Sequence, residues 1–218
     1  MSATPGYAIW DPVVRGIHWF FPVAIGFLWW TGENQQFDWH SRVGYAVLVL
    51  VLTRLLWGLV GSHYARFTVF LRSPVAVWRY LRQGAFDGVG HNPVGGWSTL
   101  LLLTLLLIQA VTGLFAYDDM LFEGPLSYWA GNLADPLTQW HEINWFLLQV
   151  VILLHVAAIA VYQFRGHKLV QLMWRGRLDE QSSPHVPVAS RWAIVALTMF
   201  SLALATLIAI APEAPSYY

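Results

Sequence analysis

The fold is decided by residues 137–163, which read LTQWHEINWFLLQVVILLHVAAIAVYQ. The stretch is long and apolar enough to cross a bilayer, yet it holds two histidines, His141 and His155. They are separated by 155 − 141 = 14 residues, and in an α-helix fourteen steps return to within about 40° of the starting direction. Both imidazoles are therefore expected on one face of one helix, with a rise of about 21 Å between them. This geometry suits two flat cofactors stacked across a membrane.

The composition of the whole chain is that of a polytopic membrane protein. Hydrophobic residues make up 57 % of the sequence and charged residues 11 %, whereas about a quarter of the residues of a soluble domain are charged. Lys and Arg balance Asp and Glu, so the net charge implies no acidic polymer, such as a nucleic acid, as a partner. Cysteine is absent, which excludes disulfides, thiolate metal sites, iron–sulfur clusters and covalently attached haem. The opening residues, MSATPGYAIWDP, predict no cleaved signal peptide.

Five membrane-spanning helices are predicted from the apolar stretches. They cover residues 14–31, 40–60, 95–117, 137–163 and 191–211. The predicted fold class is an all-α membrane protein, with a four-helix transmembrane bundle in residues 1–178. Residues 179–218 are predicted to supply a linker, a fifth C-terminal transmembrane helix and a tail.

The charges of the connections predict the orientation. The connections after the second and fourth spans are basic, and those after the first and third are acidic; the acidic residues are Glu33, Asp38, Asp118, Asp119, Glu123 and Asp135. Because cytoplasmic connections carry the excess of Lys and Arg, we predict a multi-pass membrane protein with a cytoplasmic N-terminus. An odd number of spans then places the C-terminus on the outer side. Within the first basic connection, the spacing of Val75, Trp78 and Leu81 predicts a short interfacial helix over residues 74–83.

Four histidines sort into two pairs by depth. His18 lies near the inner start of the first span and His155 near the inner end of the fourth, while His40 and His141 lie near the outer starts of their spans. Ionisable side chains at membrane depth are functional candidates. Zinc would require a third or fourth ligand from the protein, whereas a haem iron requires only two imidazoles. We therefore predict two non-covalent b-type haems, one bound by His18 and His155 and one by His40 and His141.

Other residues are assigned supporting roles. Pro22 should bend the first span near His18. Arg15, Arg42 and Arg54 are candidates for contacts with haem propionates, or else snorkel to lipid headgroups. Glycines are expected to leave space for the macrocycles or to serve helix packing; they are Gly16, Gly44, Gly58, Gly61 and Gly113.

Two further groups of side chains complete these expectations. Trp145 and Phe146 could fill the space between the haems or pack in the core. The remaining histidines are predicted to be solvated or interfacial, with His91 and His167 the most interesting of them; they are His63, His91, His167 and His185.

Three runs, together with the paired histidines of the fourth span, resemble the prokaryotic cytochrome b561 family, which includes the b-type cytochrome subunits of nickel–iron hydrogenases. The runs are WDPVVRGIHWFF at 10–21, HSRVGYAVLVLVLTRLLWGLVGSHYARF at 40–67 and GHNPVGGW at 90–97. The resemblance covers about residues 8–178. It implies a four-helix bundle with two non-covalent b haems, and axial ligation by His18, His40, His141 and His155. It also implies electron exchange between the quinone pool and a redox partner, in the bacterial inner membrane with the C-terminus in the periplasm.

Three functions remain open at this point. The leading hypothesis is a dihaem cytochrome that carries electrons between quinone and a periplasmic or membrane partner, such as a c-type cytochrome or a hydrogenase-like protein, either as a single chain or as an oligomer. The alternative is a stand-alone redox enzyme acting on superoxide or a quinol at an open site near polar groups such as Tyr45, Thr53 and His91. The third is a membrane scaffold or metal carrier without haem.

Overall fold

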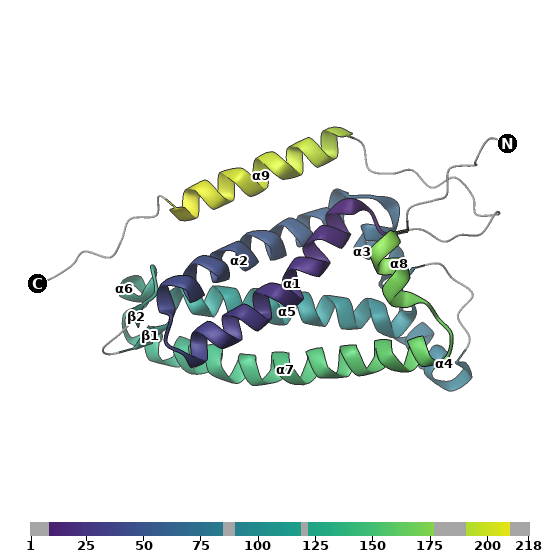
Figure 1. The fold of residues 1–218 in the computed structure, drawn as a ribbon, viewed down its shortest axis with the longest axis horizontal. Coiled ribbons are helices and arrows are strands. Elements are labelled where there is room, and N and C mark those ends of the chain that lie inside the picture. Colours follow the sequence, from purple (N-terminus) through teal and green to yellow (C-terminus); the bar gives the residue numbers. More distant parts are fainter. Residues whose placement is uncertain (1–8, 85–89, 119–121, 177–190, 210–218) are drawn as a thin grey trace, which may run out of the picture.

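Four long helices form a bundle in the computed structural model, which describes residues 9–84, 90–118, 122–176 and 191–209 (Figure 1). They are α1 (Pro12–Glu33), α2 (Phe37–Val60), α5 (Pro93–Phe115) and α7 (Ala134–Phe164). Each is long and apolar enough to cross a membrane. Four of the five predicted spans are thus confirmed, with every boundary within three residues of its predicted position.

Three helices begin in the same way, with a capping side chain followed by proline. Asp11 Oδ1 accepts a hydrogen bond from the Val14 amide at 2.9 Å, and Asn92 Oδ1 accepts one from the Gly95 amide at 2.7 Å. Ser73 caps the short helix α4 (Pro74–Gln83). The cap satisfies an amide that has no partner within the helix, and the proline that follows lacks an amide and already has a helical φ.

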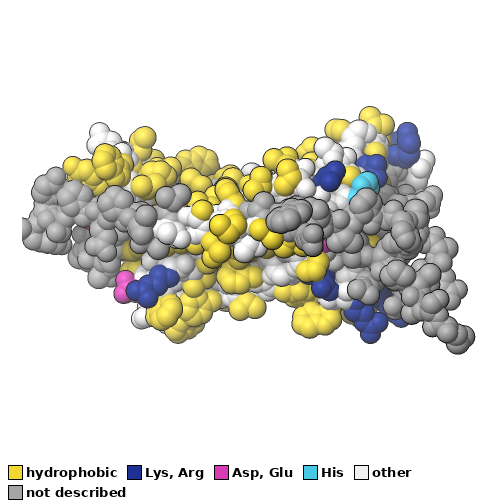
Figure 2. Space-filling model, turned by 90° about the horizontal axis from the view of Figure 1, so that it is seen from above, with side chains coloured by type: hydrophobic (Ala, Val, Ile, Leu, Met, Phe, Trp, Pro, Cys, Tyr) yellow, Lys and Arg dark blue, Asp and Glu magenta, His cyan; other side chains and the backbone are white. Residues whose placement is uncertain are grey.

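The two ends of the bundle are covered by different elements. One end carries η1 (His63–Ala65), α3 (Phe67–Phe70), α4 and α8 (Leu169–Arg175). The other end carries the antiparallel strands β1 (Tyr117–Asp118) and β2 (Phe122–Glu123), then α6 (Ser127–Ala130) and η2 (Gly131–Leu133). We call these the α4 end and the α6 end. Figure 2 shows Lys and Arg side chains gathered at the α4 end and an apolar surface along the middle of the molecule.

The helix predicted over residues 74–83 is confirmed as α4, with the same bounds. The side chains whose spacing predicted this helix, Val75, Trp78 and Leu81, are exposed. The Arg82 guanidinium lies 4.5 Å from the centre of the Trp78 ring. The Tyr80 hydroxyl is hydrogen-bonded to the Tyr162 hydroxyl. This bond ties α4 to the end of α7, so the short helix has a defined place at this end of the bundle.

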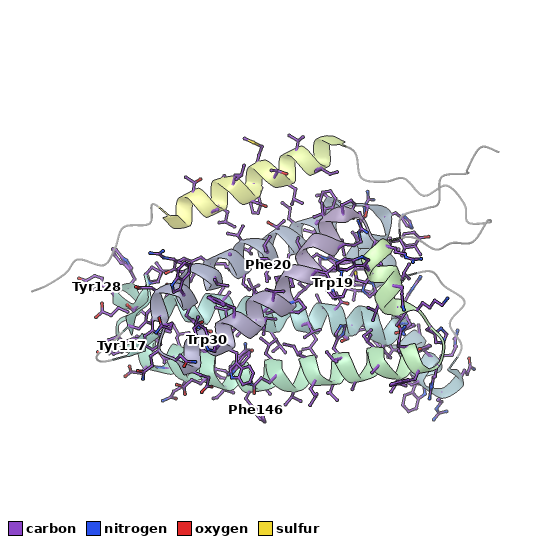
Figure 3. The ribbon with its side chains drawn as sticks, in the orientation of Figure 1. Trp19, Phe20, Trp30, Tyr117, Tyr128 and Phe146 are labelled. Atoms are coloured by element: carbon purple, nitrogen blue, oxygen red, sulfur yellow. The ribbon has the colours of Figure 1, made fainter. Side chains whose placement is uncertain are left out.

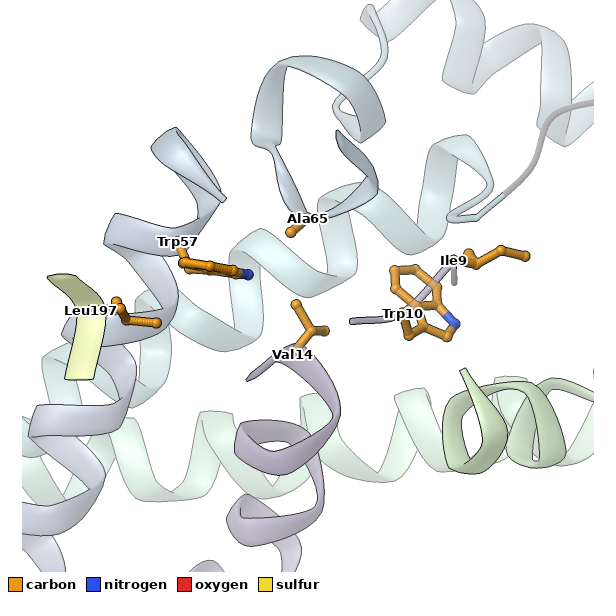
Figure 4. Close-up of a cluster of buried hydrophobic side chains, with 6 residues drawn as sticks. All are labelled: Ile9, Trp10, Val14, Trp57, Ala65 and Leu197. Atoms are coloured by element: carbon orange, nitrogen blue, oxygen red, sulfur yellow. The ribbon is translucent and has the colours of Figure 1, made fainter. Parts of the chain in front are cut away.

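The C-terminal helix α9 (Arg191–Ala209) packs on α2 from outside the bundle (Figure 1). The hydroxyls of Thr53 and Ser201 are 2.7 Å apart. Leu197 belongs to a buried cluster with Trp57 at the α4 end, and Figure 4 shows that cluster with Ile9, Trp10, Val14 and Ala65. The apolar part of α9 that the structure describes, Leu197–Thr206, is shorter than a membrane span. A fifth transmembrane helix therefore stays a prediction.

A second buried cluster fills the middle of the bundle. It contains residues from all four long helices: Ala24, Val47, Val51, Leu105, Leu106 and Leu148. Leu148 is 1 % exposed and lies seven residues from both His141 and His155. The apolar cluster therefore lies between the two histidine levels and separates them.

Candidate haem-binding site

The helix α7 carries both histidines of the deciding stretch without interruption. Its 31 residues run from Ala134 to Phe164 and include His141 and His155. A continuous helix rises about 1.5 Å per residue, so the levels of the two side chains are about 21 Å apart. Figure 3 shows aromatic side chains near both ends of the bundle, with Trp19 toward the α4 end and Trp30, Tyr117 and Tyr128 toward the α6 end.

At the α6 end, His40 of α2 and His141 of α7 face each other as predicted. Their ring centres are 6.3 Å apart and the ring planes are inclined at 68°. A metal–imidazole nitrogen bond is about 2.0 Å long, so two rings bound on opposite sides of one metal have centres about 6 Å apart. The observed spacing therefore fits a pair of axial ligands.

Hydrogen bonds define the tautomer of both rings. His40 Nδ1 lies 3.0 Å from the Leu28 carbonyl oxygen, and His141 Nδ1 lies 2.9 Å from the Gln109 carbonyl oxygen. A carbonyl oxygen can only accept, so each Nδ1 must carry the proton and donate it. In the neutral ring, Nε2 then keeps the free lone pair that a metal requires.

Two threonines and two glycines adjoin these rings. Gly113 was among the glycines expected to leave space for a macrocycle, whereas Thr31, Gly32 and Thr112 were not singled out in the sequence. Thr31 Oγ1 lies 3.2 Å from His40 Nδ1, and Thr112 Oγ1 lies 3.2 Å from His141 Nδ1. A Cβ added at Gly32 would meet the His40 ring at 3.5 Å, and one added at Gly113 would meet the His141 ring at 3.0 Å. The sequence feature that could have identified these residues is a Thr-Gly pair near the C-terminal end of α1 and of α5. These helices pack against the helices that carry His40 and His141.

At the α4 end, His18 and His155 lie within electrostatic range of each other. This half of the site has several buried polar atoms without a hydrogen-bond partner. In the described part of the chain they include Arg15 Nε, His18 Nδ1, Trp19 Nε1 and His91 Nδ1. Buried polar groups are nearly always paired in folded proteins. A cluster of unpaired ones beside a predicted ligand pair fits a site that takes up a polar-edged cofactor.

His91 also belongs to this end, where aromatic rings flank it, so it is not a solvated side chain. Its ring lies between Trp10 and Phe70, with ring centres 4.5 and 4.6 Å away. Its pKa is lowered to about 3, mainly by burial and to a smaller extent by the charges of Arg54, His155 and His18. Of the other three histidines, His63 and His167 are exposed as expected, and His185 lies outside the described residues.

The burial of neutral His91 predicts a loss of stability in acid. A free histidine binds a proton below about pH 6.5, and folded His91 does so only near pH 3. The contribution of His91 to stability should therefore fall as the pH drops below 6.5, by about 2 kcal/mol at pH 5. Thermal unfolding in detergent between pH 7.5 and 5 measures this, and His91→Gln should flatten the dependence. The exposed His63→Gln is the matched control, and an equal effect of both variants would contradict the prediction.

The three arginines predicted near propionates lie at different places. Arg15 donates from Nη1 to the Trp174 carbonyl oxygen at 2.7 Å, and the Arg42 guanidinium lies 5.6 Å from the centre of the Trp39 ring. Arg54 is buried and donates to the Ala65 carbonyl oxygen at 3.3 Å. Their contact with propionates stays a prediction.

The glycines and aromatic residues named from the sequence differ in whether they pack against neighbouring side chains. A Cβ at Gly16 or Gly44 would meet nothing within 4 Å, whereas one at Gly58 would overlap the Phe67 ring. Gly61 similarly allows close packing on Trp57, so Gly58 and Gly61 serve packing. Trp145 packs on the central cluster as expected. Phe146 is 63 % exposed and points away from the bundle (Figure 3), so it does not fill the space between the histidine levels.

The donor set favours haem over a bare metal ion. Among the residues that the structure describes, no three His, Cys, Asp or Glu side chains cluster to hold a metal. Each level offers two imidazoles, and a porphyrin supplies the four remaining nitrogens of a six-coordinate iron. The residues present therefore fit haem at both levels, with His40 and His141 the better defined pair.

Comparisons with known proteins agree with this arrangement. The family model described as prokaryotic cytochrome b561 matches residues 9–176. The chain is 28 % identical over 142 residues to a probable Ni/Fe-hydrogenase B-type cytochrome subunit of Bradyrhizobium diazoefficiens, covering 55 % of this chain and 56 % of that protein. It is 22 % identical over 141 residues to the probable Ni/Fe-hydrogenase 1 B-type cytochrome subunit of Escherichia coli (strain K12), covering 54 % and 58 %. The matched region is thus a little over half the length of these relatives. No solved structure matched the chain significantly.

Proposed function

Because the chain belongs to the prokaryotic cytochrome b561 family, we propose that it is a dihaem b-type cytochrome that carries electrons across the inner membrane. His40 and His141 bind one haem b, and His18 and His155 bind the other. A haem iron held by two imidazoles exchanges single electrons and keeps no open coordination position.

One observation carries this proposal, which is the pairing of His40 and His141. Their ring centres are spaced as two ligands of one iron require, and the Nδ1 hydrogen bonds leave both Nε2 lone pairs free. The second pair then follows from the continuous α7, which presents His155 about four turns after His141.

Charge supports the proposed orientation. Arg66, Arg72, Arg79 and Arg82 belong to the α4 end, and Glu123 and Asp135 are exposed at the α6 end. By the positive-inside rule, the α4 end is cytoplasmic and the haem of His40 and His141 lies on the periplasmic side. Asp119 of the acidic connection lies outside the described residues.

The redox partners are proposed from the relatives and from the charge of the α6 end. The named relatives are probable hydrogenase cytochrome subunits, so the partner that we propose is a hydrogenase-like or c-type redox protein on the periplasmic side. The acidic α6 end would attract a basic docking surface. Quinone in the membrane is the other member of the exchange. A stand-alone redox enzyme would need polar groups at an open site and is less favoured. The Thr53 hydroxyl is hydrogen-bonded to Ser201, and aromatic rings flank His91.

The proposal predicts two haems b for each purified chain. Pyridine haemochrome analysis should give two haems b per polypeptide, and the electron paramagnetic resonance spectrum of the oxidised protein should show only low-spin iron. In vesicles, a quinol should reduce both haems. A protein purified without haem, from cells that make haem normally, would contradict the proposal, and so would zinc or copper bound in place of iron.

A further inference from the structure

The two histidines at the α6 end are held by the same five-residue unit, once on α1 and once on α5. The first copy is LWWTG at residues 28–32 and the second is QAVTG at residues 109–113. In both copies, the carbonyl oxygen of the first residue accepts a hydrogen bond from Nδ1 of a histidine. The fourth residue is a threonine whose hydroxyl lies beside the same Nδ1 atom, and the fifth is a glycine next to the imidazole ring.

The hydrogen bonds of the two threonine hydroxyls show whether they donate to histidine or accept from it. Thr31 Oγ1 lies 3.0 Å from the Phe27 and Leu28 carbonyl oxygens, and Thr112 Oγ1 lies 2.7 Å from the Ile108 carbonyl oxygen. A hydroxyl has one proton, and each of these protons is given to the helix backbone. Toward histidine Nδ1 the oxygen can therefore only accept. Each Nδ1–H is shared between a carbonyl oxygen and a threonine oxygen that has no other proton to give.

From this geometry we infer that Thr31 and Thr112 are positioning residues that accept a second hydrogen bond from Nδ1–H of His40 and His141 and raise the donor strength of their Nε2 atoms. The inference rests on the proposed haem of this pair. A hydrogen bond accepted from the far nitrogen orients an imidazole ligand and increases its basicity. Because both ligands are treated alike, the iron between them is expected to be stabilised in its oxidised form.

The two copies differ in how tightly they hold the ring. The Gln109 carbonyl oxygen accepts from His141, and the side-chain oxygen of the same residue accepts from Asn144 Nδ2 at 2.6 Å. Asn144 is buried and also donates to the Leu105 carbonyl oxygen at 3.0 Å. Together with the tighter fit of Gly113 against its histidine, these bonds predict that the α5 copy is the more rigid one.

The test is a redox titration of the isolated cytochrome and of the variants Thr31→Val and Thr112→Val. Valine keeps the shape of threonine but lacks the hydroxyl. Each variant should keep two haems, and the midpoint potential of one of them should become more positive, because a weaker donor favours reduced iron. Thr31→Ser and Thr112→Ser should restore the original potential. Thr104→Val is the matched control, since Thr104 bonds only to its own helix through the Leu100 carbonyl oxygen and is exposed.

The outcomes separate the inference from the proposed function. If the unmodified protein holds two haems and the valine variants at 31 and 112 titrate like Thr104→Val, the inference is wrong and the function stands. Loss of both haems in those variants would show that the threonines serve folding, which also overturns the inference. Failure of the unmodified protein to bind haem would contradict the function itself.

The glycines give a second, independent readout. Gly113→Ala should disturb the low-spin signal of one haem, because its Cβ would lie 3.0 Å from the His141 ring. Gly32→Ala, at 3.5 Å from the His40 ring, should change it much less. Equal effects of the two alanines would contradict the difference in rigidity between the copies.

Discussion

Replacing His141 by alanine is expected to remove one of two haems and to leave the other in place. The haem content should fall from two to one per chain, because the facing His40 alone cannot hold a six-coordinate iron. His155→Ala should likewise remove the other haem. The central cluster around Leu148 separates the two levels, so each loss should be confined to its own level. Pyridine haemochrome analysis and the α band of the reduced protein measure both effects.

The control for these variants is His63→Ala. His63 is exposed at the α4 end, and its removal should leave two haems per chain. If His141→Ala kept both haems, or if His63→Ala lost one, the assignment of ligands would be wrong. If either ligand variant lost both haems together, the two levels would not be independent.

Asp11→Ala is expected to lower the stability of the folded protein by about 3–5 kcal/mol. The buried Asp11 carboxylate caps α1 through Oδ1. Its Oδ2 accepts from the Trp57 indole nitrogen at 2.9 Å and from the Ser62 hydroxyl, and its charge acts on buried Arg54. Alanine would leave three buried donors, on Val14, Trp57 and Ser62, without this acceptor and a buried cation uncompensated. In detergent, the midpoint of thermal unfolding should fall by about 10 °C.

The matched control for Asp11→Ala is Asp38→Ala. Asp38 lies in the first turn of α2 and its side chain is exposed, so its removal should change the unfolding midpoint by about a degree at most. Asp11→Asn keeps an oxygen that can cap α1, so it should lower the unfolding midpoint less than Asp11→Ala does. A small loss for Asp11→Ala, similar to that of Asp38→Ala, would show that this network contributes little to stability.

Much of the fold was predictable because a membrane restricts what a chain can do. Long apolar stretches must become helices in lipid, so four spans and their order followed from composition and length. The depth of each histidine followed from its distance to a helix end, and this was enough to pair His40 with His141. The helix α4 was predictable because its apolar and basic residues alternate with helical spacing.

The contacts that hold the ligands were not predictable by the same reasoning. A Thr-Gly pair is common in apolar helices, and only the packing of α1 on α2 and of α5 on α7 brings each pair to a histidine. His91 was misjudged because its sequence position indicates a connection. Trp10 and Phe70 of α3 flank its ring, and both are remote from it in sequence.

The unbroken course of α7 has a consequence for the speed of the proposed electron exchange. In the proposed arrangement both haems take one ligand from the same continuous helix, so the rise of α7 between His141 and His155 sets the separation of the two irons along the helix axis. A bilayer that tilts the protein would move both proposed irons together, and their separation along α7 would stay the same. The transmembrane step should then keep the same rate in membranes of different thickness.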